Sequence, residues 1–182
     1  TFKSPKNIVI SNKTLGNYLN YLYDAFMIGR AVRYNIKGKK YINTLSKYYF
    51  TDIGLRYALL DFRQTEQTHI MENVIYNELL YRGYSVDVGI VEVTGHDKNG
   101  KFIRKQLEVD FVVNDGSQRY YIQSAFSIPD EEKMSQETAS FRYIDDSFKK
   151  ILVVKDDIMP YTDDNGFLHI GLFDFLLKPQ MM

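Results

Sequence analysis

The chain of 182 residues contains no cysteine, no tryptophan and only four prolines. The absence of cysteine excludes disulfide bonds, zinc sites built on thiolates and a cysteine nucleophile. No apolar run reaches the roughly 18–20 residues that a membrane-spanning helix needs, and no signal-peptide pattern opens the chain. These absences predict a cytoplasmic protein that makes no contact with a membrane.

Net charge is also lacking, because 23 basic residues balance 23 acidic ones. This balance excludes a uniformly polybasic nucleic-acid binder. The charges are nevertheless unevenly placed, since residues 1–60 carry a net +8 and the remainder carries a net −8. We expect two units, 1–62 and 63–182. Two explanations stay open: the basic half binds nucleic acid, or the two halves dock on each other.

The basic half contains a helical pattern followed by alternating residues. Apolar side chains recur with helical spacing over 11–28 and predict one buried stripe, and Gly29 stands where a C-terminal cap is expected. Short strands flank a basic turn at 37–40, and Asp52 or Thr51 is placed to cap a short helix. A helix followed by a basic hairpin is typical of part of a winged helix. The residues expected to contact nucleic acid are Lys13, Asn17, Lys37, Lys39 and Lys40.

The acidic half predicts the element order α-β-β-β-α-β. Apolar spacing and turn residues indicate helices at about 66–82 and 130–145, strands at about 84–93, 107–113, 120–125 and 150–154, and a turn at 97–100. We therefore expect a mixed α/β (α+β) class, with a partial winged-helix segment followed by a domain built on a central mixed sheet.

Strand alternation marks a candidate site in this half. Side chains alternate between the two faces of a strand, so Glu108 and Asp110 are predicted to share one face with Val112. If the next strand is a neighbour, Gln123 and Ala125 lie beside these acids. Acids within an otherwise apolar strand need a partner, a metal or solvent. The alternative is a half-exposed strand whose acids meet Lys or Arg.

Five segments, taken in order, carry a resemblance to a known family: 17–25, 47–56, 72–79, 108–112 and 121–125. Together they resemble the C-terminal region of prokaryotic AAA+-type ATPases. In that family a winged-helix part and a domain similar to PD-(D/E)xK nucleases follow the ATPase domain. The resemblance implies a restriction-endonuclease-like second domain, and an ATPase domain of the same full-length protein as partner. The chain has no P-loop motif, so we do not expect it to bind ATP.

The resemblance also implies site roles. Such nucleases hold Mg²⁺ through a strand Asp, an acid two residues before a Lys on the next strand, and often a helix acid. Glu72 then corresponds to the helix acid and Asp110 to the strand Asp, and these two are the implied metal ligands. The remaining motif falls on Gln123 and Ala125, which supply neither an anion nor a cation. The implied site is vestigial, with Glu108 as a further candidate and weak Mg²⁺ binding at most.

Three hypotheses follow for function. The first is a non-catalytic accessory region of an AAA+-type ATPase that binds nucleic acid, such as DNA, or a protein partner. The second is a Mg²⁺-dependent nuclease with an altered active site. The third is a structural module for docking or homo-oligomerisation.

Overall fold

The structure is a computed structural model that describes residues 2–3, 9–42, 44–63, 66–96, 100–178 and 180. The expected turn at 97–100 lies outside these residues except for Gly100. The chain forms two compact units, which we describe separately. Unit 1 comprises residues 1–30 and 48–64, and unit 2 comprises residues 31–47 and 65–182.

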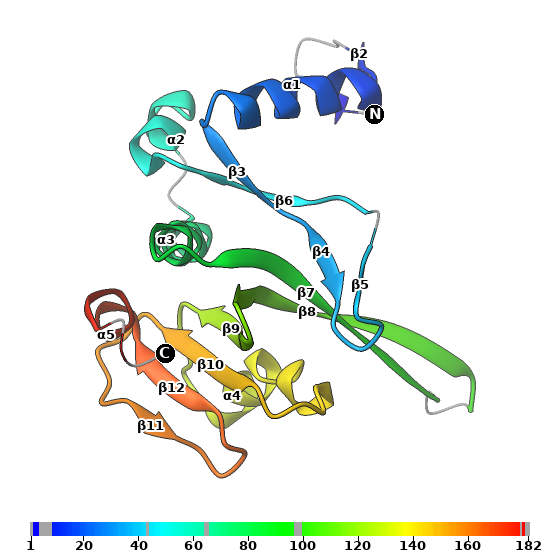
Figure 1. The fold of residues 1–182 in the computed structure, drawn as a ribbon, viewed down its shortest axis with the longest axis vertical. Coiled ribbons are helices and arrows are strands. Elements are labelled where there is room, and N and C mark those ends of the chain that lie inside the picture. The colour runs from blue at the N-terminus through cyan, green and yellow to red at the C-terminus, as the bar shows by residue number, and fades with distance from the viewer. Residues whose placement is uncertain are drawn as a thin grey trace. The chain divides into compact units, whose positions relative to one another are not determined.

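Unit 1 is built from two helices and two small sheets (Figure 1). Its elements are β1 (Phe2–Lys3), β2 (Val9–Ile10), α1 (Asn12–Asp24), β3 (Ile28–Ala31), β6 (Lys47–Phe50) and α2 (Ile53–Leu59). Strands β3 and β6, which pair with each other, each place one end residue in unit 2. The expected helix start is confirmed at Asp52, whose carboxylate accepts hydrogen bonds from the backbone N–H groups of Gly54 and Leu55.

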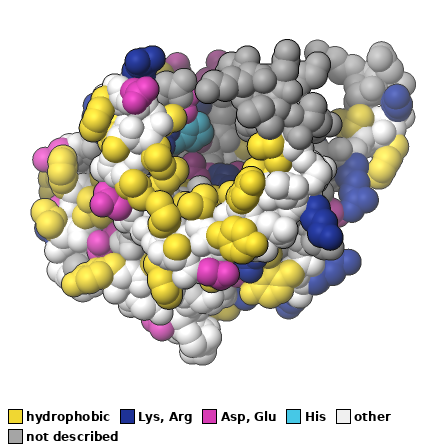
Figure 2. Space-filling view, turned by 90° about the horizontal axis from the view of Figure 1, so that it is seen from above, with side chains coloured by type: hydrophobic (Ala, Val, Ile, Leu, Met, Phe, Trp, Pro, Cys, Tyr) yellow, Lys and Arg dark blue, Asp and Glu magenta, His cyan; other side chains and the backbone are white. Residues whose placement is uncertain are grey.

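Helix α1 forms within the expected range, but it differs from expectation in two ways. It ends at Asp24, and Phe26, with φ of 57°, adopts the left-handed conformation expected of Gly29, which instead lies in β3. None of its residues is buried, and Phe26 is 84% exposed. Two helices and two-stranded sheets are too small to enclose an amphipathic helix. Figure 2 shows hydrophobic side chains spread over the face that it displays.

Unit 2 is organised around an eight-stranded mixed sheet in the order β11-β12-β10-β9-β8-β7-β4-β5. Its strands are β4 (Arg33–Asn35), β5 (Lys40–Tyr41), β7 (Ser85–His96), β8 (Phe102–Asp115), β9 (Gln118–Ala125), β10 (Lys149–Val154), β11 (Tyr161–Thr162) and β12 (Leu168–Gly171). Strands β4 and β7, β9 and β10, and β10 and β12 are parallel, and the other pairs are antiparallel. The mixed α/β class with a central mixed sheet is confirmed.

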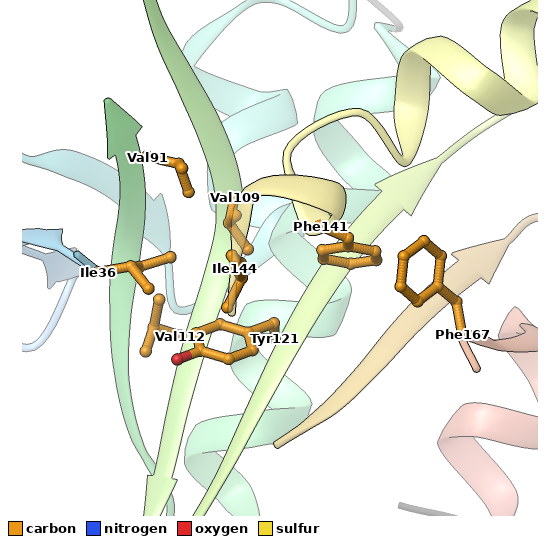
Figure 3. Close-up of a cluster of buried hydrophobic side chains, with 8 residues drawn as sticks. All are labelled: Ile36, Val91, Val109, Val112, Tyr121, Phe141, Ile144 and Phe167. Atoms are coloured by element: carbon orange, nitrogen blue, oxygen red, sulfur yellow. The ribbon is translucent and has the colours of Figure 1, made fainter. Parts of the chain in front are cut away.

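Helices cover both faces of this sheet. They are α3 (Gln67–Tyr81), α4 (Glu131–Glu137), the 3₁₀ turn η1 (Phe141–Tyr143) and α5 (Leu172–Leu177). Tyr76 of α3 packs on Phe111 of β8, and the Arg82 guanidinium that follows α3 lies over the Phe175 ring of α5. On the other face, Phe141 of η1 joins Val112 and Tyr121 in a buried cluster (Figure 3). The chain order α3-β7-β8-β9-α4-β10 matches the expected α-β-β-β-α-β arrangement.

The basic hairpin belongs to unit 2. Strand β4 pairs in parallel with β7 through Arg33↔Val88, and β5 forms the outer edge of the sheet. Residues 31–47 therefore pack with the large sheet, whereas the charge pattern groups them with residues 1–62. Pairing with β7 supplies the backbone hydrogen bonds and apolar cover that so short a hairpin cannot supply alone.

Gly89 of β7 lies at a tightly packed point of this sheet. A Cβ atom built there would be 2.8 Å from Ile36 Cδ1 and Val112 Cγ2, and 2.9 Å from Val109 Cβ. These three residues belong to the buried cluster in Figure 3. The sheet and the β4–β5 hairpin can meet here only because the residue has no side chain.

We expect Gly89→Ala to lower the free energy of unfolding by about 1–3 kcal/mol, because the new methyl group overpacks the core. The measurement is urea denaturation followed by circular dichroism. Gly95→Ala is the matched control in the same strand, since no heavy atom lies within 4 Å of its added Cβ. Equal stability of the two variants would contradict this account of the packing.

Candidate functional site: an ammonium group among three carboxylates

Three acids of unit 2 converge on the side chain of Lys47. The Lys47 Nζ atom lies 2.7 Å from Glu108 Oε1, 2.8 Å from Glu72 Oε1 and 3.6 Å from Asp110 Oδ1. A second cation, Arg33, holds Glu108 Oε2 at 2.9 Å. We call these five residues the Lys47 cluster. Of the five residues that the sequence proposed for a site, the cluster contains the three acids, Glu72, Glu108 and Asp110.

The five residues of the cluster come from four elements of the fold. Glu72 projects from α3, Glu108 and Asp110 lie on β8, Arg33 lies on β4, and Lys47 begins β6. The Arg33 Nε atom also donates a hydrogen bond to the backbone oxygen of Leu45, at 2.8 Å. Arg33 thereby holds the segment that leads into Lys47, which fixes the direction from which the ammonium group enters.

A β-bulge sets the direction of the acids. In the β7–β8 pairing, Asp87 lies opposite Val112 and Gly89 lies opposite Val109, so Asp110 and Phe111 together oppose one residue. An extra residue resets the alternation of side chains. The prediction that Val112 shares a face with Glu108 and Asp110 is therefore wrong, because Val112 belongs to the same buried cluster as Val109, which lies between those two acids in the strand.

Asp110 also replaces part of the backbone ladder between β8 and β9. Their paired register ends at Phe111↔Ile122. Beyond that point, Ser124 N–H donates to Asp110 Oδ2 at 2.9 Å, and Asp110 N–H donates to Gln123 Oε1 at 3.3 Å. These bonds satisfy backbone groups that the ladder no longer pairs. The contact between these two residues is therefore made by the Gln123 side chain and the Asp110 backbone.

Ala125 lies in apolar surroundings. It is 2% exposed and forms a buried cluster with Leu152 and Val154, against which Met134 of α4 packs. The Ala125 side chain therefore faces α4, which lies on the face of the sheet opposite α3. A lysine at this place would have to bury its ammonium group among aliphatic side chains.

Burial and charge shift the proton affinities within the cluster. Burial, and then the charge of Glu72, raise the pKa of Asp110 to about 7, while Lys47 and the Ser124 N–H act in the opposite direction. For Lys47, burial favours the neutral amine, but the charges of Asp110 and Glu72 and the hydrogen bond to Glu108 outweigh it and raise the pKa of the ammonium group. Lys47 thus stays charged.

Burial, and after it the excess negative charge of the cluster, explain why the pKa of Asp110 is raised. If all three carboxylates are ionised, they exceed the two cations, Lys47 and Arg33, by one negative charge. Asp110 is the most distant of the three acids from the ammonium group and its side chain is only 12% exposed. A proton on Asp110 removes the excess charge at the least cost in ion pairing.

A metal role for Asp110 and Glu72 stays a prediction. Within the described ranges, no group of three or more His, Cys, Asp or Glu residues is arranged to hold a metal ion. The carboxylates of the cluster surround an ammonium group instead. The residues as they stand therefore do not fit a divalent cation.

The residues expected to contact nucleic acid are exposed but divided between the units. Lys13 and Asn17 lie on α1 of unit 1. Lys37, Lys39 and Lys40 lie on the β4–β5 hairpin of unit 2, where Lys37 Nζ is 5.8 Å from the centre of the Tyr143 ring. Their role in binding stays a prediction.

Sequence reasoning missed Lys47 and Arg33 as site residues. Both are separated from the acids by long stretches of chain, so spacing gives no signal for the ion pairs. A usable signal was present, because two acids in an apolar strand need a partner, a metal or solvent, and Lys or Arg can be that partner. Lys47 also opens one of the five segments that carry the family resemblance.

Comparisons with known proteins place the chain beside uncharacterized relatives. Residues 3–66 match the model of a domain of unknown function, DUF8612. An uncharacterized protein of Haemophilus influenzae is 33% identical over 173 residues, which cover 95% of this chain and 39% of that protein. An uncharacterized protein of Methanocaldococcus jannaschii is 29% identical over 168 residues, which cover 92% of this chain and 34% of that protein.

The chain thus spans about two-fifths or less of the length of these two relatives. No solved structure matches it significantly. In the part of the chain that the structure describes, no helix is long and apolar enough to cross a membrane.

The pKa of Asp110 predicts a pH dependence of stability. The folded protein keeps this proton up to about pH 7, whereas an unperturbed carboxyl loses it near 3.8. The bound proton therefore stabilises the folded protein fully below pH 3.8, and this stabilisation is lost as the pH rises to 7. Over that range the free energy of unfolding falls by at most about 1.4 kcal/mol per pH unit.

We expect Asp110→Asn to remove this slope, so that its stability relative to the native chain rises between pH 4 and 7. Urea unfolding at several pH values measures this difference in stability. The control is Asp115→Asn, at an exposed position on the same strand. A constant difference between native chain and Asp110→Asn over this range would refute the assignment.

Proposed function

We propose that this chain is a non-catalytic accessory region of an AAA+-type ATPase, which binds nucleic acid and carries a nuclease-like site that no longer supports chemistry. The observation that carries the proposal is the position of the Lys47 ammonium group, within 2.7–3.6 Å of three carboxylates.

The electrostatics of the cluster argue against metal-dependent hydrolysis. A divalent cation bound by carboxylates lowers the pKa of an attacking water and neutralises charge that develops on the phosphate. An ammonium group brings one positive charge and has only N–H donors, so it offers no coordination position for water. With Lys47 in place, the acids are paired with a cation that lacks the properties of a metal centre.

Two other positions support the same proposal. By the family resemblance, Gln123 and Ala125 stand where an acid and a lysine belong. The Gln123 amide oxygen accepts the Asp110 backbone N–H, and Ala125 is enclosed by aliphatic side chains. Losing one preorganised electrostatic group commonly costs about 10²–10³ in rate.

The link to an ATPase rests on the five segments that resemble that family. The relatives are much longer than the matched region, so they have room for a further domain. The nucleic-acid role rests on exposed Lys37, Lys39 and Lys40, which can form ion pairs with phosphates. A protein partner for this region is the alternative that a binding experiment distinguishes.

The second candidate function is a nuclease with an altered site. The observation in its favour is the same Lys47, because it places a cation beside Glu72 and Asp110 from a different element than the family pattern uses. In this alternative Glu72 and Asp110 would hold a metal that activates water, and Lys47 would orient that water or stabilise the phosphate.

We expect the chain to cleave neither DNA nor RNA in the presence of Mg²⁺ or Mn²⁺, because the Lys47 ammonium group lies between the carboxylates that would hold the metal. The measurement is a gel assay on single- and double-stranded substrates, with Asp110→Ala as the matched control for contaminating nuclease. Cleavage by the native chain that is absent from Asp110→Ala and Lys47→Met would make the nuclease the better assignment.

We expect salt-sensitive binding of DNA, which the triple change Lys37→Ala, Lys39→Ala and Lys40→Ala weakens, because lysines on phosphates release counterions. Fluorescence anisotropy of a labelled duplex at low and moderate salt provides the measurement. If the native chain binds no DNA even at low salt, the nucleic-acid part of this proposal is wrong and a protein partner takes its place.

A further inference from the structure

Strands β7 and β8 continue beyond the rest of the sheet as a two-stranded arm. Strand β4 pairs with β7 only over Val88–Ile90, and β9 pairs with β8 only over Phe111–Asp115. Residues 91–96 and 102–107 therefore pair only with each other among the described strands. Figure 1 shows this hairpin running past the other strands of unit 2. We call residues 91–96 and 100–107 the β-arm.

The β-arm has an exposed and cationic second strand. Every residue from 101 to 106 is exposed, including Lys101, Arg104 and Lys105. The one acid among the described residues of the arm is Glu92, which forms an ion pair with Arg104. Phe102, 61% exposed, adds an aromatic surface between the cations.

The basic turn of the β4–β5 hairpin lies at the base of this arm. Strand β4 runs parallel to β7, so its C-terminal turn, residues 36–39, points toward the same end as the arm. The hydrogen bond from Arg104, together with the charges of Arg104 and Lys40, lowers the pKa of Glu92. The β4–β5 hairpin thus lies beside β7 in the sheet, at the point where the arm begins.

We propose that the β-arm, together with the basic turn, binds the phosphate backbone of double-stranded DNA through Lys101, Arg104 and Lys105. This inference rests on the proposed function and names the surface that carries it. The partner follows from charge. Among the described residues, segment 35–41 and the β-arm together contain six Lys or Arg and one Glu. A polyanion is the partner that such a surface attracts.

The shape of the arm fits the same partner. A two-stranded antiparallel ribbon has dimensions that the major groove of B-form DNA admits. Cations placed along one strand of the ribbon can then reach phosphates beside the groove. A protein partner is a poorer match, because lysine is depleted in protein–protein interfaces and five of the six cations of this surface are lysines.

The experiment compares three variants of the full chain in anisotropy titrations with a labelled random-sequence DNA duplex. The arm variant carries Lys101→Gln, Arg104→Gln and Lys105→Gln. A matched control carries Lys149→Gln, Lys155→Gln and Lys178→Gln, which remove the same charge near β10 and α5. The third variant, Glu92→Gln, removes the acid of the arm. Thermal unfolding verifies that each variant is folded.

We expect the arm variant to bind DNA about tenfold more weakly than the native chain at about 50 mM salt. The slope of log affinity against log salt should become shallower by about 0.9 for each phosphate that the variant no longer neutralises. The control should bind like the native chain, and Glu92→Gln should bind more tightly. Equal affinity of arm variant and control, with native binding intact, would overturn the inference while leaving the proposed function standing. Absence of native binding would overturn both.

Discussion

The pairing of three carboxylates with the Lys47 ammonium group and the Arg33 guanidinium is the constraint on which the site of this protein depends. Glu72, Glu108 and Asp110 lie where α3 packs on the middle of the sheet, and water can reach them only in part. Unpaired carboxylates at such a place would oppose folding, so the chain must deliver a cation there. Lys47 meets this need, and Arg33 supports it by holding both Glu108 and the segment before Lys47.

Strand β8 connects the charged site to the apolar core. Its bulge at Asp110 and Phe111 turns acids toward α3 while Val109 and Val112 remain together on the other face. Gly89, which lies opposite Val109 and next to the bulge, leaves room for Ile36 of the basic hairpin. The same few residues therefore fix the packing of the sheet, the direction of the acids and the attachment of the hairpin that carries the exposed lysines.

The unequal distribution of charge takes a different form in the structure than in the chain. The sequence divides into a basic and an acidic half, but residues 31–47 pack in unit 2. Within that unit, Lys47 and Arg33 neutralise acids, whereas Lys37, Lys39 and Lys40 stay exposed beside the β-arm. Cations that are close in sequence thus serve two purposes, internal pairing and an open surface, and only the second can act on a partner.

Local sequence patterns were sufficient to predict the main elements. Hydrophobic spacing predicted α3 and the three following strands, Asp52 marked the start of α2, and the apolar β8 with its acids identified Glu108 and Asp110 as unusual. These features are local, because periodicity and capping depend on neighbours within a few residues. Two further features emerge only when the chain is folded: Lys47 meets Glu72 and Asp110, and a bulge resets the faces of β8. An ion pair across long chain separations depends on strand pairing, and an extra residue in a strand leaves its hydrophobic composition unchanged, so neither has a local signature.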